Sequence, residues 1–255
     1  METGIMIKRK LYLAIVTTLL VTTTNVFAEE EKEDDKDKSP WTNSVEFGFI
    51  RATGNTTSQT YVFKGDTVYE IDKWRHTGHL EAFGQQSDDD DGKNNVTAER
   101  YKASAKSDYK YTELDYVFGL AIWDKDRFSG FEYETSFVVG YGRKVIKRDD
   151  MELDLEIGPG MKFVKVENGK KANDEILRLA GKYWWDITDS SKFTQEVSTE
   201  LNKDLTTTES ITSVQANIID ELALKFSYTV TNRSKVPKGN KETDTTAGMT
   251  LIYKF

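Results

Sequence analysis

Apolar and polar residues alternate one by one along much of this chain. The alternation is nearly regular in four segments, residues 131–142, 152–163, 222–230 and 246–255. In the last segment Met249, Leu251 and Tyr253 share one face, and Ile252 is the single large apolar residue on the other. Side chains of a β-strand alternate with period 2, whereas helical spacing would scatter these residues around a cylinder. The pattern therefore predicts strands.

Other segments show the same alternation less clearly. Five of them lie around residues 45–49, 61–71, 114–122, 177–185 and 193–201. The apolar face of the middle one holds Leu114, Tyr116, Phe118, Leu120 and Ile122. Residues 74–86 and 96–109 are ambiguous, because small and charged residues occupy both faces. We count twelve strand candidates between Trp41 and Phe255, an even number.

The connections between these candidates differ in length. In an outer-membrane barrel, external loops are longer than periplasmic turns, and the two kinds follow each other along the chain. The odd-numbered connections include SDDDDGKNN and NRSKVPKGNKET, while the even-numbered ones include the pairs Asp72-Lys73 and Asp220-Glu221. The tight Gly54-Asn55 turn and the longer connection around residues 147–150 depart from this rule. The remaining connections favour a barrel over a sandwich.

The first residues predict export. Residues 1–28 combine a basic start at Lys8, Arg9 and Lys10, an apolar centre over residues 11–21 and a small-residue ending at Ala28. This combination is typical of a cleaved signal peptide, and the apolar centre is too short to span a bilayer comfortably. Residues 29–40 form a mixed charge run, which predicts a flexible tail. Residues 41–255 would then form one barrel domain.

Composition narrows the chemistry. The chain has no cysteine, which excludes disulfides, Cys-based zinc sites and thiol catalysis. Residues 29–255 contain 32 basic and 42 acidic residues, a net charge of −10. A chain of this charge lacks the basic patch typical of nucleic-acid binding, so no nucleic acid is expected as a partner.

Alternation alone does not say which face is inside. A soluble sandwich would bury the apolar face, whereas a membrane barrel turns it toward lipid and its charged face toward a lumen. The export signal, the charged residues of the polar faces and the apolar ladder that ends on Phe255 favour the second arrangement. We therefore predict an all-β protein, a single antiparallel transmembrane β-barrel of about 12 strands with meander topology.

The end of the chain resembles the C-terminal signature of bacterial outer-membrane proteins. The matching residues are Gly248, Met249, Leu251, Tyr253 and Phe255. In such proteins the terminal aromatic residue and the alternating apolar positions before it guide recognition by the barrel assembly machinery. The resemblance implies that machinery as a partner and the bacterial outer membrane as the location.

The start of the predicted barrel resembles that of a known family. The stretch WTNSVEFGFIRATGNTTSQTYVF is similar to the opening hairpin of the salt-induced outer membrane protein family, whose domain has no assigned function. The matching pieces are Trp41, the run Glu46-Phe47-Gly48 and the turn at residues 53–56, and the close at residues 251–255 matches as well. The resemblance implies an outer-membrane barrel, expression under salt stress and no established chemistry.

Two features invite a chemical interpretation. His76 and His79 are three residues apart, so on a strand they point to opposite faces and cannot share a metal ion. His79 shares a face with Glu81, a pair conceivable in a hydrolase, although spacing ties no serine to it. The carboxylates at residues 88–91 suggest calcium, but a solvated external loop is the plainer interpretation, with contact to a divalent ion or to lipopolysaccharide as the alternative. No cofactor, metal site or catalytic residue is predicted.

Charged residues occupy the polar faces of the sixth to ninth strand candidates. If the turn between the sixth and seventh is centred near Lys147, Gly142 faces Glu152 and Glu134 faces Gly160, so carboxylates lie opposite glycines. The candidates for lumen charges are Glu132, Glu134, Glu152, Asp154, Glu156, Lys162, Arg178, Lys182, Glu196 and Glu200. They would either pair because they cannot face lipid, or form a constriction that selects solutes.

The sequence thus predicts a narrow channel or an envelope-stability protein without catalysis. An outer-membrane hydrolase with His79 as its base and a soluble secreted β-rich binding module are the alternatives. Outer-membrane lipid, lipopolysaccharide and small solutes or ions are the expected partners beside the assembly machinery. Twelve strands lie between the eight of a filled barrel and the sixteen of an aqueous channel, so the width of the lumen stays open.

Overall fold

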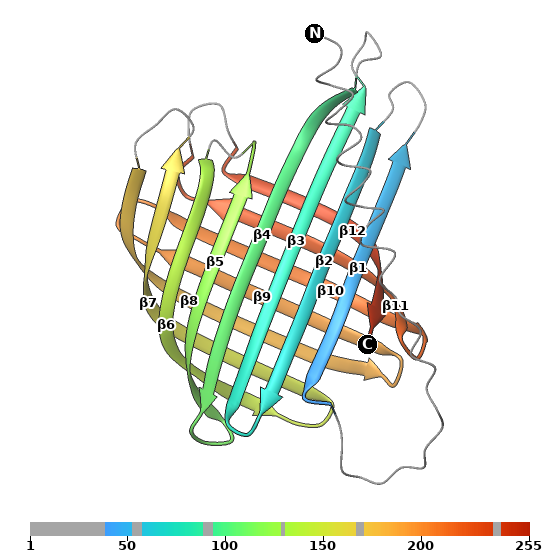
Figure 1. Cartoon of the computed structure of the whole chain (residues 1–255), viewed down its shortest axis with the longest axis vertical. Coiled ribbons are helices and arrows are strands. Elements are labelled where there is room, and N and C mark those ends of the chain that lie inside the picture. Colours follow the sequence, from blue (N-terminus) through green and yellow to red (C-terminus); the bar gives the residue numbers. More distant parts are fainter. Residues whose placement is uncertain (1–38, 53–57, 89–93, 129–130, 167–170, 237–240) are drawn as a thin grey trace. The chain divides into compact units, whose positions relative to one another are not determined.

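Twelve antiparallel strands form one closed barrel in the computed structural model (Figure 1). The structure describes residues 39–52, 58–88, 94–128, 131–166, 171–236 and 241–255. The strands are β1 (Trp41–Ala52), β2 (Ser58–Ile71), β3 (Trp74–Asp88), β4 (Asn94–Lys110), β5 (Asp115–Asp126), β6 (Phe131–Lys147), β7 (Met151–Val166), β8 (Lys171–Thr188), β9 (Ser191–Leu201), β10 (Thr206–Ile219), β11 (Leu222–Arg233) and β12 (Thr243–Lys254). In this part of the chain no helix is long and apolar enough to cross a membrane.

Each strand pairs with its neighbours in sequence, and β12 closes the ring on β1. The predicted all-β class, strand number and meander topology are therefore confirmed. The connections after the even-numbered strands, such as Asp72-Lys73, lie at one end of the barrel, which we call the turn end. Asp72 adopts the left-handed conformation that two-residue hairpin turns require, with φ 50°. The other connections define the loop end.

The C-terminal ladder forms the closing strand. Tyr253 pairs with Val45 and Leu251 with Phe47, while the backbone N–H of Phe255 donates to the carbonyl of Asn43 over 3.0 Å. Met249, Leu251 and Tyr253 lie on the outer wall, with exposed fractions between 42% and 53%. Ile252 faces inward and is 3% exposed, which explains the mismatch in the sequence pattern.

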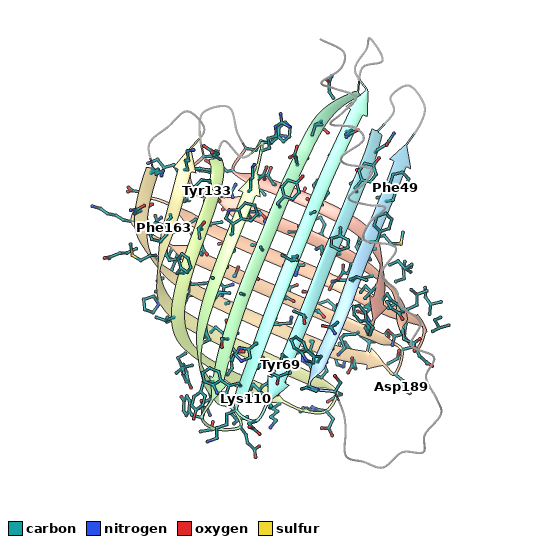
Figure 2. The ribbon with its side chains drawn as sticks, viewed as in Figure 1. Phe49, Tyr69, Lys110, Tyr133, Phe163 and Asp189 are labelled. Carbon is teal, nitrogen blue, oxygen red and sulfur yellow. The ribbon has the colours of Figure 1, made fainter. Side chains whose placement is uncertain are left out.

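The outer wall is apolar and rich in aromatic rings. Phe47, Phe137 and Val139 each expose more than half of their surface there. Rings cluster at the turn end, where Trp41 packs on Tyr69 and Trp74 on Tyr109 with centroids 4.6 Å and 5.0 Å apart. Figure 2 shows Tyr69 at this end and Phe49, Tyr133 and Phe163 toward the loop end. A broad exposed apolar surface bounded by aromatic girdles is the outer face of a transmembrane barrel.

One strand departs from the expected orientation. We expected the apolar face of residues 114–122 to lie against lipid, but Tyr116 and Phe118 point into the barrel and are 1% and 4% exposed. They form an internal apolar cluster with Val138 and Ile176. The outward positions of β5 include Val117 and Trp123. Both faces of β5 carry apolar residues, so alternation could not assign the wall.

Glycines make room for these inward rings. A side-chain carbon at Gly142 would collide with the ring of Tyr116, and one at Gly140 with the ring of Phe118. The expected register was wrong: Gly142 pairs with Glu156, and Glu134 pairs with Val164. Gly142 thus still faces a carboxylate, that of Glu156, and the space at both glycines accommodates the rings of Tyr116 and Phe118.

This packing predicts that a side chain added at Gly142 destabilises the barrel. We expect Gly142→Ala to lower the free energy of unfolding by about 1–3 kcal/mol, because the new methyl group overpacks the wall against Tyr116. Urea unfolding in detergent micelles, followed by tryptophan fluorescence, measures this. Gly119→Ala is the matched control, because an added carbon at Gly119 meets nothing within 4 Å. Equal stability of the two variants would contradict the packing argument.

Candidate functional site in the barrel lumen

The inner wall of the barrel carries charges of both signs. Its buried polar side chains include Glu46, Asp108, Glu134 and Lys162, each at most 6% exposed. Alternation along the strands places them opposite the apolar outer positions. Charged groups that are removed from bulk water need partners. In this lumen they form ion pairs between adjacent strands and between strands that are further apart.

The first cluster joins β3, β4, β5 and β7. Arg75 contacts Asp108 at 2.7 Å, and Lys106 lies 3.1 Å from the same carboxylate. Lys106 also pairs with Glu156, which accepts a hydrogen bond from the hydroxyl of Tyr116 over 2.8 Å. The ammonium of Lys106 lies 5.1 Å from the centre of the Tyr116 ring. The apolar cluster and the charged lining therefore meet at Lys106.

A second cluster crosses the lumen. Glu209 on β10 contacts Lys102 at 2.6 Å and Arg100 at 3.2 Å, both on β4, and Arg100 continues to Asp124 at 2.9 Å. In the ring of strands β4 and β10 are on opposite sides, and Figure 1 shows β4 on the near wall with β10 behind it. These side chains bridge the barrel from wall to wall.

A third cluster also connects distant strands toward the loop end. Glu134 on β6 contacts Arg233 on β11 at 2.9 Å and Lys162 on β7 at 3.2 Å. Lys162 contacts Glu200 on β9 at 2.9 Å. The side chains of Glu134, Lys162 and Arg233 are between 7% and 11% exposed. Together with Glu209 they narrow this half of the lumen.

The lining is more open elsewhere. Lys182 on β8 and Glu196 on β9 contact each other at 2.9 Å, yet their side chains are 56% and 43% exposed. By contrast, Lys144 near the turn end lies 2.5 Å from Glu152 and 3.8 Å from Asp154, and these three side chains are only 13–18% exposed. The lumen therefore combines a constriction with a section in which charged groups are well hydrated.

Several of the predicted lumen charges form ion pairs with one another or with other charged residues. The structure brings together Glu134, Lys162 and Glu200 in one cluster, and Glu156 with Arg178 at 3.8 Å in another. Glu132 is separate from them. A bulge between Phe131 and Tyr133 turns Phe131 inward, and Glu132 pairs with Lys165 at 2.5 Å, with both side chains more than 30% exposed. The shift of register at the bulge explains why alternation placed Glu132 in the lumen.

Sequence reasoning missed the side chains that cross the lumen. Arg100, Lys102, Lys106 and Asp108 all lie in the segment that was ambiguous. Their spacing was the available signal, because every charge from Arg100 to Asp108 falls on an even position. Glu209 and Arg233 had no comparable signal, since their partners are about a hundred residues away.

The two histidines lie on opposite faces of β3. His76 stacks on Trp74 on the outer wall, with centroids 5.7 Å apart. The Nδ1 atom of His79 is 2.7 Å from Asp66, and its Nε2 atom is 3.9 Å from Glu81. Ser104 stands opposite His79 in the β3–β4 register, but the hydrogen-bond partner of this ring in the described part of the chain is Asp66. His79 therefore belongs to the paired charges of the lumen.

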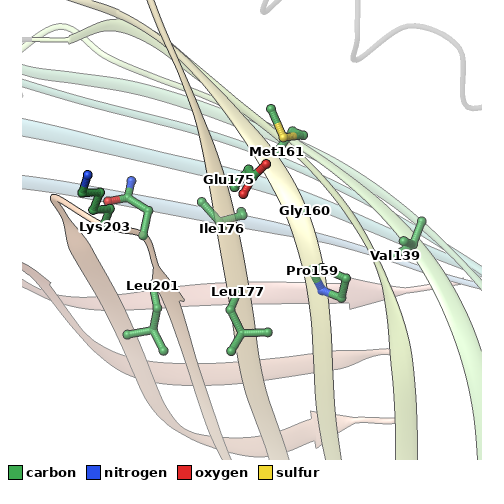
Figure 3. A pocket seen from close by; sticks show the side chains of 10 residues that line it. Val139, Pro159, Gly160, Met161, Glu175, Ile176, Leu177, Leu201 and Lys203 are labelled. Carbon is green, nitrogen blue, oxygen red and sulfur yellow. The ribbon is translucent and has the colours of Figure 1, made fainter.

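Other candidate sites give little chemistry. The described residues contain no group of three or more His, Asp or Glu side chains able to hold a metal ion. Three of the four carboxylates at residues 88–91 lie outside the described residues. A hollow of about 650 Å³ lies over β7 and β8 (Figure 3). Its lining includes outward residues such as Met161, Leu177 and Leu201 and none of the paired lumen charges.

Comparisons with known proteins agree with this architecture. Uncharacterized protein YdiY of Escherichia coli (strain K12) is 30% identical over 219 residues, which cover 86% of this chain and 84% of that protein. An outer membrane channel from Pseudomonas putida F1 superposes with a TM-score of 0.50 at 10% identity, covering 89% of this chain and 100% of that one. The translocator domain of autotransporter NalP from Neisseria meningitidis gives 0.48 at 10% identity, covering 87% and 90%.

The structural likeness is one of fold, because identity is low. The sequence match is more specific. Residues 45–255, nearly the whole barrel, match a family model described as a protein of unknown function, DUF481. The chain therefore belongs to the DUF481 family, whose function is not assigned.

Proposed function

We propose that this protein is a narrow, non-catalytic channel of the bacterial outer membrane that passes small ions. The observation that carries the proposal is the set of contacts from Glu209 to Arg100 and Lys102 across the lumen. A lumen bridged by single side chains is too narrow at that level for large solutes. Fixed charges of both signs line the path on either side of the bridge, as in channels that select by charge.

The proposal includes an orientation and a location. The turn end, where Trp41 and Phe255 lie, would face the periplasm, because short turns are periplasmic in barrels of this kind. The loop end would face the exterior, which places the constriction on the external side. The outer wall would contact lipid, with lipopolysaccharide around the loop end. Export by a cleaved signal peptide and insertion by the barrel assembly machinery are parts of the same proposal.

Conductance across a planar bilayer tests the function. Purified protein should first show the heat-dependent mobility shift of a folded barrel, and it should then conduct in potassium chloride. We expect Glu134→Gln to shift the reversal potential toward anion preference and Arg178→Gln to shift it toward cation preference, because each removes one fixed lumen charge. Glu132→Gln is the matched control outside the lumen and should leave the potential unchanged.

The result of this experiment also separates the remaining hypotheses. A folded, inserted barrel that conducts no current would overturn the channel and favour a plugged barrel with a role in envelope integrity, including one under salt stress. Catalysis is not proposed, because the ring of His79 contacts Asp66 and Glu81 and, among the described residues, no serine hydroxyl that it could activate. If a His79→Ala variant carries less current, we would attribute the loss to the changed charge of the lumen, because His79 contacts Asp66 and Glu81 there.

A further inference from the structure

The seam between β1 and β12 is short. Pairing begins at the turn end with Asn43 and Phe255, which exchange two backbone hydrogen bonds, and it ends at Phe47 with Leu251. If the same register continued, Gly48 would pair with Thr250 and Ile50 with Gly248. Instead β1 stays paired with β2 as far as Ala52, and β12 stays paired with β11 as far as Thr243. Within the described residues, two strand edges therefore part toward the loop end without pairing to each other.

Exposure agrees with an opening at this place. Ile50 lies on the lumen side of β1 by alternation, yet 51% of its surface is exposed. On β12, the residues from Thr243 to Ala247 are exposed on both alternating faces. Thr250 and Ile252, further toward the turn end, are only 4% and 3% exposed. The β1 and β12 strands are thus paired near the turn end and separate from each other toward the loop end.

A polar clasp marks the point at which the seam closes. The carboxylate of Glu46 on β1 accepts a hydrogen bond from Lys225 on β11 over 2.6 Å and from the hydroxyl of Thr250 on β12 over 3.1 Å. A side-chain carbon at Gly48 would lie 3.0 Å from the carbonyl oxygen of Met249, so the strands are still close there. The opening begins immediately beyond these residues.

The two sides of the opening differ in chemistry. Outside are Phe49 and Met249, both about half exposed on the apolar wall. Inside is the charged lumen. The strand edges themselves present backbone N–H and C=O groups, which are costly to leave unpaired next to hydrocarbon. A molecule that fits all three surfaces has an apolar chain and a polar or ionic head able to hydrogen-bond to backbone.

We propose that the parted β1–β12 seam is a lateral opening that binds a single-chain amphiphile, with its acyl chain toward the bilayer and its head at the strand edges. Glu46 sets the lower limit of the opening. The inference does not depend on whether the lumen conducts ions, because it concerns a route between lumen and membrane rather than a route through the barrel.

Contact quenching by a brominated fatty acid tests the proposal. The chain has no cysteine, so one introduced cysteine can carry a single fluorescent bimane label. The test label is at Gly248→Cys, where an added side-chain carbon has only Ser227 Oγ within 4 Å, at 3.8 Å. Ser198→Cys, on the lumen side of β9 in a fully paired wall, is the closed-wall control. Leu224→Cys, on the outer wall, is the lipid-exposed control.

The labelled barrels are placed in lipid nanodiscs and titrated with dibromolaurate, after a heat-dependent mobility shift shows that each has folded. We expect the label at residue 248 to lose nearly as much fluorescence as the label at residue 224, while the label at residue 198 stays bright. Protection of residue 248 equal to that of residue 198 would overturn the proposal.

Disulfide formation gives a second, independent readout. The pair Ile50→Cys with Gly248→Cys should resist oxidation to a disulfide, because bridging needs Cα atoms within about 7 Å. The control pair Ser213→Cys with Ser227→Cys, directly opposed on β10 and β11, should oxidise readily. Equal oxidation of the two pairs would show a closed seam and would also overturn the proposal, whatever current the protein carries.

Discussion

Glu209→Gln is expected to change both the current and the stability of the barrel. It removes the carboxylate that joins Arg100 and Lys102 across the lumen. Conductance should rise because the bridge is weakened, and the reversal potential should move toward anion preference because two cations remain. The free energy of unfolding should fall by about 1–3 kcal/mol, less than for a fully buried ion pair, because the three side chains are 17–23% exposed.

Glu196→Gln is the control for this prediction. It makes the same chemical change in the ion pair with Lys182, whose side chains are about half exposed. Exposed pairs contribute only about 0–1 kcal/mol, so stability should hardly change. Single-channel recording and urea unfolding of both variants provide the comparison. A Glu209→Gln protein indistinguishable from Glu196→Gln would mean that the cross-lumen contact does not limit passage.

Deleting Phe255, or replacing it by Asp, is expected to remove most of the protein from the outer membrane. The folded barrel would lose the stacking of Phe255 on Tyr253, at 5.8 Å between centroids, and with the deletion two backbone hydrogen bonds to Asn43. These interactions amount to about 3 kcal/mol, less than the stability of about 5–15 kcal/mol typical of a domain. A large fall in membrane level would therefore report failed recognition during assembly rather than an unfolded barrel.

Quantified outer-membrane fractions, normalised to total synthesis and to the exported periplasmic pool, measure this effect. Phe255→Tyr keeps the terminal ring and should assemble normally. Normal membrane levels of the Phe255→Asp protein would refute the assembly signal, although the closing strand would stand as the structure describes it.

Alternation was sufficient for the architecture, and it failed where both faces of a strand were apolar. It identified the closing strand, including the inward position of Ile252. It misplaced Tyr116 and Phe118, because the space for their rings comes from Gly142 and Gly140, which stand opposite them on the neighbouring strand β6. The apolar pattern of one strand does not show where the neighbouring strand carries glycines that leave room for an inward ring.

The lumen site was predictable only in part, for a related physical reason. Alternation gives the face of a residue but not its partner. It could place Glu134 and Lys162 on the inner wall, yet the contact of Glu134 with Arg233 depends on barrel closure. The bulge at Glu132 interrupts period 2. The four-residue error in the β6–β7 register has another cause, because the turn lies at residues 148–150 rather than near Lys147.

Because of where the tryptophans lie, the intrinsic fluorescence of this barrel reports on the medium around it. Trp41, Trp74, Trp123 and Trp185 are on the outer wall, each at least 39% exposed. Trp184 points the other way and has Lys192 over its ring at 4.0 Å. Intrinsic emission therefore samples the solvent around the barrel far more than its interior. Transfer from water to hydrocarbon will shift most of that emission to the blue, so insertion can be timed without any attached dye.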